Sequence, residues 1–362
     1  MKTPIFNRLA RWSATFGFAG IGLVLSAPAQ SDDNSGFDRY FGLQKVSSDD
    51  DWTRHFRIGA VVGLNVSANF NENGVFNVSG NNPGAGIYDN GYVREDQTGN
   101  AGGITTYWGY DNASQYSAAA QTLTFNSSSS FTTSGSGKVN SGPFAGFDLA
   151  YGDNLWYWGH IRIGWELGFD LLPISVTDHE ALSASVNQTT YVYKTGGTVL
   201  PGAGYQGSYG GPGPTISTQG STSSTQTTLG NITGSRTLDA MLYAVRLGPS
   251  LYCDLTPRIG VELAGGPAVG VVTGDYTYNE TVTVGGVSAH NTGGFGGTDF
   301  IFGGNISGTV LFHFQDNNRN ADIFVGAAFA PMGKASFSSG GREAQLNFGG
   351  QVYLNAGINW PF

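Results

Sequence analysis

A chain of 362 residues with 57 glycines and only 12% charged residues has the wrong composition for a soluble helical enzyme and a normal one for a β-barrel. Its formal net charge of −9 argues against nucleic acid and anionic phosphates as partners. Because Cys253 is the one cysteine, no disulfide forms within the chain.

The first 29 residues have the three parts of a secretory signal peptide. Lys2, Arg8 and Arg11 make the start positive, residues 12–25 are apolar but too short to span a bilayer, and residues 27–29 fit an A-x-A cleavage site. No later stretch has the ~20 consecutive apolar residues of a membrane helix. The chain is therefore predicted to be exported without a helical membrane span.

Residues 30–53 are polar and acidic, and we expect them to form a flexible periplasmic segment. From residue 54 onward, apolar and polar side chains alternate, and a period of two predicts β-strands with one apolar and one polar face. In the third strand, Ile163, Trp165 and Leu167 share the apolar face. The eight predicted strands span residues 54–70, 141–151, 156–172, 238–253, 258–272, 299–314, 321–330 and 346–362.

The connections between these strands alternate in length. The short turns are predicted at residues 152–155, 254–257 and 315–320, and the longer connections at residues 71–140, 173–237, 273–298 and 331–345. This alternation is typical of outer-membrane barrels with both chain ends in the periplasm. Residues 54–362 are therefore predicted to be all-β, forming a closed antiparallel up-and-down transmembrane β-barrel of eight strands with long extracellular loops.

Two features leave details of the strand pairing open. Residues 121–125 and 189–193 are predicted as short hairpin extensions above the membrane; if they span it instead, the barrel has ten strands. Pro249 and Pro267 interrupt two predicted strands. Because proline cannot donate a hydrogen bond to the ladder, we expect a β-bulge at each.

The polar faces of the strands carry charges of both signs. These residues are Arg57, Asp148, Arg162, Glu166, Asp170, Arg246, Glu262 and Asp322. A barrel of eight strands is just filled by its own side chains, and an unpaired buried charge costs several kcal/mol. We expect these residues to pair as a salt-bridge plug in the lumen. The alternative is a polar permeation path or gate.

The chain ends on LNAGINWPF, which gives the final strand an aromatic carboxy-terminus. Together with the signal peptide and eight amphipathic strands, this ending resembles the small eight-stranded outer-membrane proteins, the OmpA-barrel, OmpX and OmpW-like group. The resemblance implies that the barrel-assembly machinery reads the final strand. The residues that it assigns to this signal are Tyr353, Gly357, Ile358, Trp360 and Phe362. Pro361 and the long loops depart from the group's pattern.

The first long connection holds aromatic side chains close to Asp and Asn. The residues of interest are Tyr88, Asp89, Tyr92, Tyr107, Trp108 and Tyr110. Clustered aromatics with polar neighbours are surfaces on which sugars and other ligands stack, so these are candidate ligand contacts. The alternative is a loop that packs on its own aromatic side chains.

No motif for a metal, cofactor or catalytic site emerges from the sequence. The five histidines share no metal-ligand spacing: His55 is placed before the barrel, His160 and His313 face inward near the periplasmic end, and the other two lie in loops. A G-x-G-x-x-G at residues 202–207 lacks the strand and helix of a dinucleotide site. We therefore expect no cofactor, no bound metal and no catalytic residue.

The sequence predicts a bacterial outer-membrane barrel with a structural or surface-interaction role, its loops presented outside the cell. Its expected partners are outer-membrane lipid, the barrel-assembly machinery and an extracellular ligand or surface. The alternative function is a small-solute porin or channel. An outer-membrane enzyme is the less favoured third reading.

Overall fold

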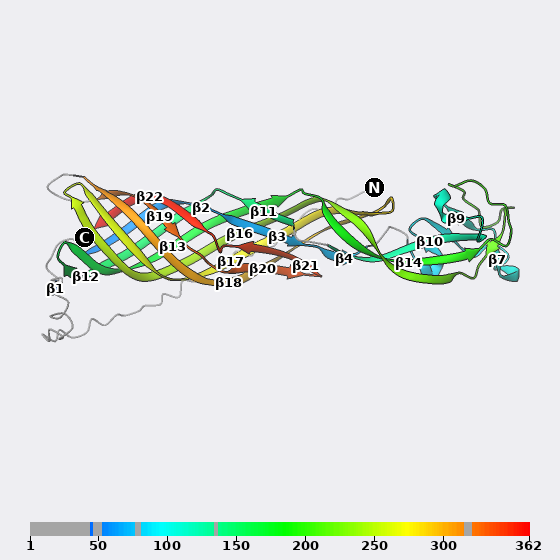
Figure 1. Ribbon diagram of the computed structural model, residues 1–362, viewed down its shortest axis with the longest axis horizontal. Helices are drawn as coiled ribbons and strands as arrows, with labels where there is room; N and C mark the ends of the chain where they lie inside the picture. Colours follow the sequence, from blue (N-terminus) through cyan, green and yellow to red (C-terminus); the bar gives the residue numbers. More distant parts are fainter. Residues whose placement is uncertain (1–43, 46–52, 77–80, 134–136, 315–320) are drawn as a thin grey trace, which may run out of the picture. The chain divides into compact units, whose positions relative to one another are not determined.

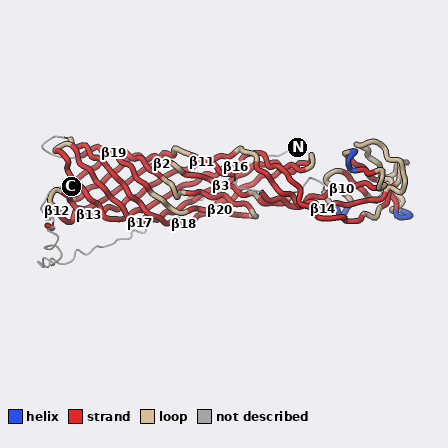
Figure 2. The backbone as a smooth tube through the Cα atoms, viewed as in Figure 1, coloured by secondary structure: helices blue, strands red, loops and turns tan. Residues whose placement is uncertain are grey.

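The computed structural model describes residues 44–45, 53–76, 81–133, 137–314 and 321–362, and this part of the chain is almost entirely β-sheet (Figures 1 and 2). The helices within these ranges are three short 3-10 turns, η1 (Pro83–Ala85), η2 (Ala101–Gly103) and η3 (Ala113–Gln115). In the same ranges no helix is long and apolar enough to cross a membrane. The predicted signal peptide, most of the predicted periplasmic segment and the predicted turn at 315–320 lie outside the described residues.

Eight of the described strands pair antiparallel in a closed ring. Their bounds are β2 (Arg54–Leu64), β12 (Phe144–Trp158), β13 (Ile161–Asp178), β16 (Ser221–Thr256), β17 (Ile259–Val284), β18 (Val287–His313), β19 (Asp322–Phe329) and β22 (Val352–Pro361). Each strand pairs with the next, and β22 pairs back with β2. The predicted closed, up-and-down barrel is therefore confirmed.

Five further strands extend the structure beyond one end of this ring, four of them in a sheet of their own. We call the barrel end where Arg54 N–H donates to Phe362 O, at 3.1 Å, the proximal end, and the opposite end distal. A second sheet has the order β11–β3–β21–β20, with bounds β11 (Gly137–Ser141), β3 (Val66–Asn71), β21 (Arg342–Asn347) and β20 (Lys334–Ser339). β14 (Leu182–Lys194) pairs with the distal part of β16.

The segments that would have made a ten-stranded barrel pair with each other instead. β10 (Thr122–Thr133) runs antiparallel to β14, with Leu123 opposite Tyr193, and in the described residues neither strand enters the ring. The remaining strands are short: β1 (Gln44–Lys45), β4 (Asn73–Val75), β5 (Ile87–Tyr88), β6 (Gly91–Val93), β7 (Ile104–Thr105), β8 (Trp108–Tyr110), β9 (Tyr116–Ser117) and β15 (Ile216–Ser217).

The outward face of the proximal barrel is a belt of exposed apolar side chains. Its most exposed members include Leu247, Leu263, Phe302, Ile306, Val325 and Leu354. Hydrocarbon offers no hydrogen-bond partner to the backbone, so a sheet that meets lipid must close on itself, as this ring does. The belt ends distally where the outward side chains become polar, at Ser175, Asp239, Thr273 and Thr298. We take this line as the distal boundary of the membrane-spanning segments.

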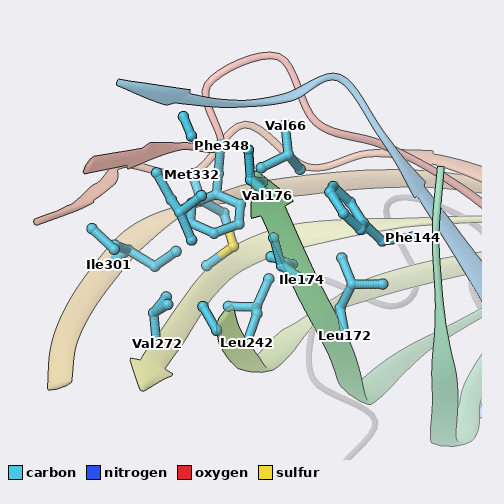
Figure 3. Packing of buried hydrophobic residues seen from close by; sticks show 14 of the residues in the cluster. Val66, Phe144, Leu172, Ile174, Val176, Leu242, Val272, Ile301, Met332 and Phe348 are labelled. Atoms are coloured by element: carbon cyan, nitrogen blue, oxygen red, sulfur yellow. The ribbon is translucent and has the colours of Figure 1, made fainter. Parts of the chain in front are cut away.

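The interior changes in the opposite sense along the same strands. Charged side chains fill the proximal lumen, whereas distally the inward positions are apolar and are joined by apolar residues of the second sheet (Figure 3). We call this group of apolar side chains the apolar plug. It contains Val66, Phe70, Leu172, Ile174, Leu242, Val272, Ile301, Met332, Phe337, Leu346 and Phe348. Each of these side chains is at most 2% exposed except Met332 at 5%. The apolar plug closes the lumen on the distal side of these charged side chains.

Two predicted strands are shorter in the structure than the alternation suggested. The strand predicted at 54–70 breaks at Asn65, whose φ of 61° is incompatible with an extended strand. Beyond the break, Val66 and Phe70 lie inside the plug and not on the predicted lipid face. Similarly, the final strand begins at Val352, and the upstream Leu346 belongs to β21 and the plug. In both places the apolar alternation continues in sequence. The residues pair in the second sheet, so their apolar side chains face the plug instead of the lipid.

The first short turn also differs from the prediction. Residues 152–155 lie within β12, which continues to Trp158 with a pairing irregularity between Asn154 and Trp156. The chain turns at Gly159, which adopts φ 60°, and His160. His160 is therefore exposed and does not face the lumen as predicted.

The two prolines fall in one gap of the ladder, Pro249 across from Gly265 and Pro267 across from Leu247. Pairing of β16 with β17 stops at Arg246–Ala268 and resumes at Ser250–Ala264. Pro249 and Pro267 lie in the unpaired stretch between these contacts. Because the two strands lose the same number of residues, this is a break in pairing and not the predicted pair of bulges.

Shortening a side chain of the apolar plug should destabilise the barrel more than shortening a side chain of the belt. Leu172 is fully buried, so Leu172→Ala should lower the free energy of unfolding by ~2–5 kcal/mol, because it leaves a cavity. Leu247 is 50% exposed on the belt and serves as the matched control, because lipid fills the space that Leu247→Ala vacates. Urea unfolding of the refolded protein in detergent, followed by the gel mobility of unboiled samples, measures both. Equal losses would contradict the plug.

Candidate functional site: the charged lumen

The proximal lumen holds a group of ionisable side chains that we call the lumen network. Strand alternation places all of them on inward-facing positions of the ring. They are Arg57 on β2, Asp148 on β12, Glu166 and Asp170 on β13, Arg246 on β16 and Glu262 on β17. The structure thus brings together six of the eight charged residues predicted for the lumen.

Each arginine of the lumen network bridges two carboxylates. Arg57 Nη1 lies 3.1 Å from Glu262 Oε2, and Arg57 Nη2 contacts Glu166. Arg246 donates to Asp148 Oδ1 at 2.6 Å and to Asp170 Oδ2 at 2.5 Å. Asp148 and Asp170 stand directly opposite each other on β12 and β13, so the Arg246 guanidinium keeps two like charges together.

The other two predicted residues belong to a separate group nearer the proximal end. Arg162 donates to Asp254 at 2.6 Å. Asp322 lies 2.9 Å from His313 Nδ1, and Asp254 lies 3.1 Å from His313 Nε2. Tyr252 donates to the same Asp254 at 2.8 Å. The sequence assigned Asp254 to a turn, so its role as the partner that joins Arg162 to His313 was missed.

The free space between these groups is small. A cavity of about 10 Å³ lies beside Arg57, Asp170 and Arg246, and one of about 30 Å³ lies beside His55 and Arg162. Spaces of this size admit water molecules and little else. Together with the apolar plug, the paired charges of the described residues fill much of the lumen.

His55 was missed as a member of this site. It lies on β2 rather than before the barrel, opposite Gly152 on β12, and it is 8% exposed. A side chain at Gly152 would collide with the His55 ring, which shows how closely that ring fills the lumen. The available signal was its parity, because His55 and Arg57 are two residues apart on one strand and therefore share the inward face.

A second buried charge group lies beyond the membrane boundary, and we call it the distal cluster. It consists of Glu72, Asp178, Arg236, Glu280 and Arg342. Arg236 lies 2.9 Å from both Asp178 and Glu280, and Arg342 bridges Glu280, at 2.6 Å, to Glu72. The sequence placed all five in loops, and nothing in their spacing predicts that they meet.

Glu72 has an altered acidity because of this setting. Burial raises the pKa of its carboxyl from 4.5 to about 7, and the nearby Glu280 carboxylate acts in the same direction. Tyr276 donates a hydrogen bond to Glu72, and Arg342 contacts it, which offsets part of the rise. The distal cluster contains three carboxylates and two guanidinium groups, so a proton on Glu72 makes it neutral.

The distal cluster predicts that acid stabilises the distal sheets. The folded state holds the Glu72 proton more tightly than the unfolded chain, so the full contribution is present below about pH 4.5 and is lost as the pH rises through about 7. The difference corresponds to ~3 kcal/mol. Hydrogen exchange of β3 and β21 should be slower at pH 5 than at pH 8, after correction for intrinsic rates. Glu72→Gln should remove this dependence, whereas Glu343→Gln, at a half-exposed position on β21, should keep it.

Three of the six predicted ligand contacts of the first long connection belong to a buried aromatic core. Tyr88, Trp108 and Tyr110 are buried and pack with Leu123 and Phe125. These three rings are therefore unavailable to an external ligand, and the loop packs on its own aromatics. The rings pack together rather than face a ligand because ordering a long segment costs conformational entropy. A hydrophobic cluster within the segment offsets that cost.

The other three predicted contacts differ. Asp89 is buried and accepts a hydrogen bond from the Ser128 N–H at 2.7 Å, a structural role. Tyr92 donates to Gly207 O at 2.7 Å and is half-buried. Tyr107 remains half-exposed, and the Arg94 guanidinium lies 5.1 Å from its ring centre.

The residues of the predicted assembly signal occupy β22 and its end. Tyr353 faces the lumen and is 3% exposed, whereas Ile358 and Phe362 are exposed on the outward face. Trp360 stacks on Phe56 with ring centres 6.2 Å apart. Gly357 is required by its setting, because a Cβ there would lie 2.1 Å from Ile58 O on β2.

Comparisons with known proteins add only distant likenesses. No protein-family model matches the chain, and no curated protein matches it. Among solved structures it is similar to Ail, the attachment invasion locus protein of Yersinia pestis, at 10% identity and a TM-score of 0.23 over 83% of this chain and 99% of that one. It is also similar to the Escherichia coli outer membrane protease OmpT, at 9% identity and a TM-score of 0.22, over 88% of this chain and 99% of that one. The third similar structure is a Pseudomonas aeruginosa FadL homologue, at 10% identity and a TM-score of 0.18, over 86% of this chain and 90% of that one.

Likenesses at this level carry no inference about family, ligand or activity. The assignment to the barrel fold rests instead on the closed ring of strand pairing and on the exposed apolar belt.

Proposed function

We propose that this chain is a bacterial outer-membrane protein whose sealed barrel anchors a folded β-structure at the cell surface, with a structural or surface-interaction role. The observation that carries the proposal is the filled lumen, in which paired charges occupy the proximal half and the apolar plug occupies the distal half. A barrel of this kind holds its distal sheets in place and transports nothing.

The location follows from the two faces of the ring. An exposed apolar belt around a closed barrel is stable in a bilayer and would aggregate in water. Barrels of this type belong to the bacterial outer membrane, which an exported chain reaches through the barrel-assembly machinery. We propose that this machinery reads β22 through Tyr353, Gly357, Ile358, Trp360 and Phe362. Membership of the OmpA-barrel, OmpX and OmpW-like group is part of this proposal.

Long distal strands and loops suit a role at the surface. Beyond the belt, β16, β17 and β18 continue with polar outward faces. β14, which pairs with β16, and β10 contribute side chains to the small aromatic core around Trp108. Tyr107 and Tyr209 meet edge to face with ring centres 6.2 Å apart, and Tyr209 is 59% exposed. With Arg94 beside Tyr107, they form the best candidate contact for a polar or aromatic surface ligand. The proposal assigns the chain no catalytic activity.

The rival function is a small-solute channel, favoured by the polar lumen alone. Refolded protein inserted into a planar bilayer should give no steady conductance, and Glu166→Gln should not create one, because the apolar plug remains in place. A porin inserted under the same conditions provides the positive control. Steady conductance that changes in Glu166→Gln would establish the channel and overturn the sealed barrel.

The surface location is tested by labelling intact cells. With Cys253 replaced by Ser, a cysteine introduced as Tyr209→Cys should react with a membrane-impermeant maleimide, because this distal position is exposed. Trp158→Cys, which is 58% exposed at the proximal end, is the matched control and should react only after the outer membrane is permeabilised. The reverse pattern would show that the distal sheets face the periplasm.

A further inference from the structure

Three buried side chains from three different strands converge within the proximal lumen. They are His55 on β2, Glu166 on β13 and Glu262 on β17, each at most 8% exposed. His55 Nε2 lies 3.7 Å from Glu166 Oε2 and 3.7 Å from Glu262 Oε1. All three atoms lie within 4.8 Å of one another. Two carboxylate oxygens and an imidazole nitrogen therefore face one small volume.

The spacing of these atoms is wrong for hydrogen bonding. An N–H···O bond needs a separation of about 2.7–3.2 Å, so a distance of 3.7 Å leaves the His55 ring nitrogen without a bond to either carboxylate. His55 Nε2 and Glu262 Oε1 are both shielded from solvent and make no hydrogen bond with any described residue. Burying a polar atom without a partner is unfavourable, so this arrangement calls for a group that engages both.

The same spacing suits a metal ion. A tetrahedral ion with ligands at about 2.1 Å holds them about 3.4 Å from each other, close to the separations found here. Imidazole nitrogen with carboxylate oxygen is a donor set of zinc and similar transition metals. Calcium and magnesium prefer all-oxygen sites, which His55 does not provide.

The charge of the lumen network points the same way. Its two arginines face four carboxylates, which leaves an excess of two negative charges when all four are ionised and His55 is neutral. A buried carboxylate whose charge is not compensated destabilises the fold. One divalent cation between His55, Glu166 and Glu262 brings the network to neutrality.

Arg57 leaves the ligand oxygen of Glu262 free and shares that of Glu166. Its guanidinium approaches Glu262 through Oε2, at 3.1 Å, whereas the oxygen that faces His55 is Oε1. Glu166 Oε2 contacts both Arg57 and the His55 side, so His55 and Glu262 provide the strongest ligands and Glu166 completes the set.

An ion can reach this place from the proximal end. The cavity of about 30 Å³ is lined by His55 and Glu262 together with Arg54, Asn154 and Arg162. Arg54 is more than half exposed, so this cavity lies next to the proximal mouth of the barrel.

We propose that His55, Glu166 and Glu262 form a binding site for one divalent transition-metal ion of the zinc class, entered from the proximal end of the lumen. The ion joins β2, β13 and β17 across the barrel and thereby stabilises it. This inference is independent of the surface role proposed above, because a sealed barrel can lack the ion and a channel can contain it.

The test uses full-length protein refolded in detergent and freed of metal by a chelator. Titration with Zn²⁺ in a calorimeter, and metal analysis after dialysis, should give one ion per chain. Co²⁺ should give the visible absorption of a tetrahedral site. Zn²⁺ should also raise the urea concentration at the unfolding midpoint.

The variants separate this site from adventitious binding. His55→Ala and the isosteric Glu262→Gln should each weaken Zn²⁺ binding at least 100-fold, with folding checked by the mobility of unboiled samples. His160→Ala, at the exposed proximal turn, should bind as the unaltered chain does. If His55→Ala does not fold, Glu262→Gln decides the outcome.

Two results would overturn the proposal. One is no stoichiometric binding of Zn²⁺ or Co²⁺ by the folded, unaltered chain, which would mean that protons balance the lumen charge. The other is binding that persists in Glu262→Gln or is lost equally in His160→Ala, which would place the ion elsewhere.

Discussion

The structure depends on one constraint, which is that hydrocarbon offers no hydrogen-bond partner to a peptide group. The ring answers it by pairing every strand on both sides, with β22 returning to β2. Once the sheet is closed, strand geometry sends every second side chain to the lipid and the others to the lumen. The remaining features follow from what those two sets of side chains meet along the length of the barrel.

The two environments exchange places along single, unbroken strands. On β16, Leu247 and Val245 face outward into the belt while Arg246 faces the lumen; further along the same strand, Asp239 faces outward and Leu238 lies in the plug. The direction of each side chain is unchanged and only the surrounding medium differs. In lipid the apolar residues belong outside, and in water they belong inside. This exchange marks the membrane boundary and also seals the barrel, because the distal apolar interior cannot remain hollow.

Buried charge is treated differently in the two halves. In the distal cluster, three carboxylates and two guanidinium groups come within one proton of neutrality, and the raised pKa of Glu72 provides that proton. In the lumen network the carboxylate excess is larger, and His55 stands 3.7 Å from two carboxylate oxygens without a hydrogen bond. The unpartnered nitrogen of His55 and oxygen of Glu262 are why the lumen, rather than the distal cluster, is the place for a cation.

The sequence alone determined the all-β barrel, the outward face of the belt and most of the lumen charges, because period-two alternation is a local property that survives folding. Arg57, Glu166 and Arg246 could be assigned to the lumen from parity alone. Tertiary structure decided what parity cannot express. The positive φ of Asn65 switches Val66 and Phe70 into the plug, and distant segments bring Glu72 to Arg342. His55, Glu166 and Glu262 meet only because the ring closes, since residues far apart in sequence become neighbours through strand pairing across the whole barrel.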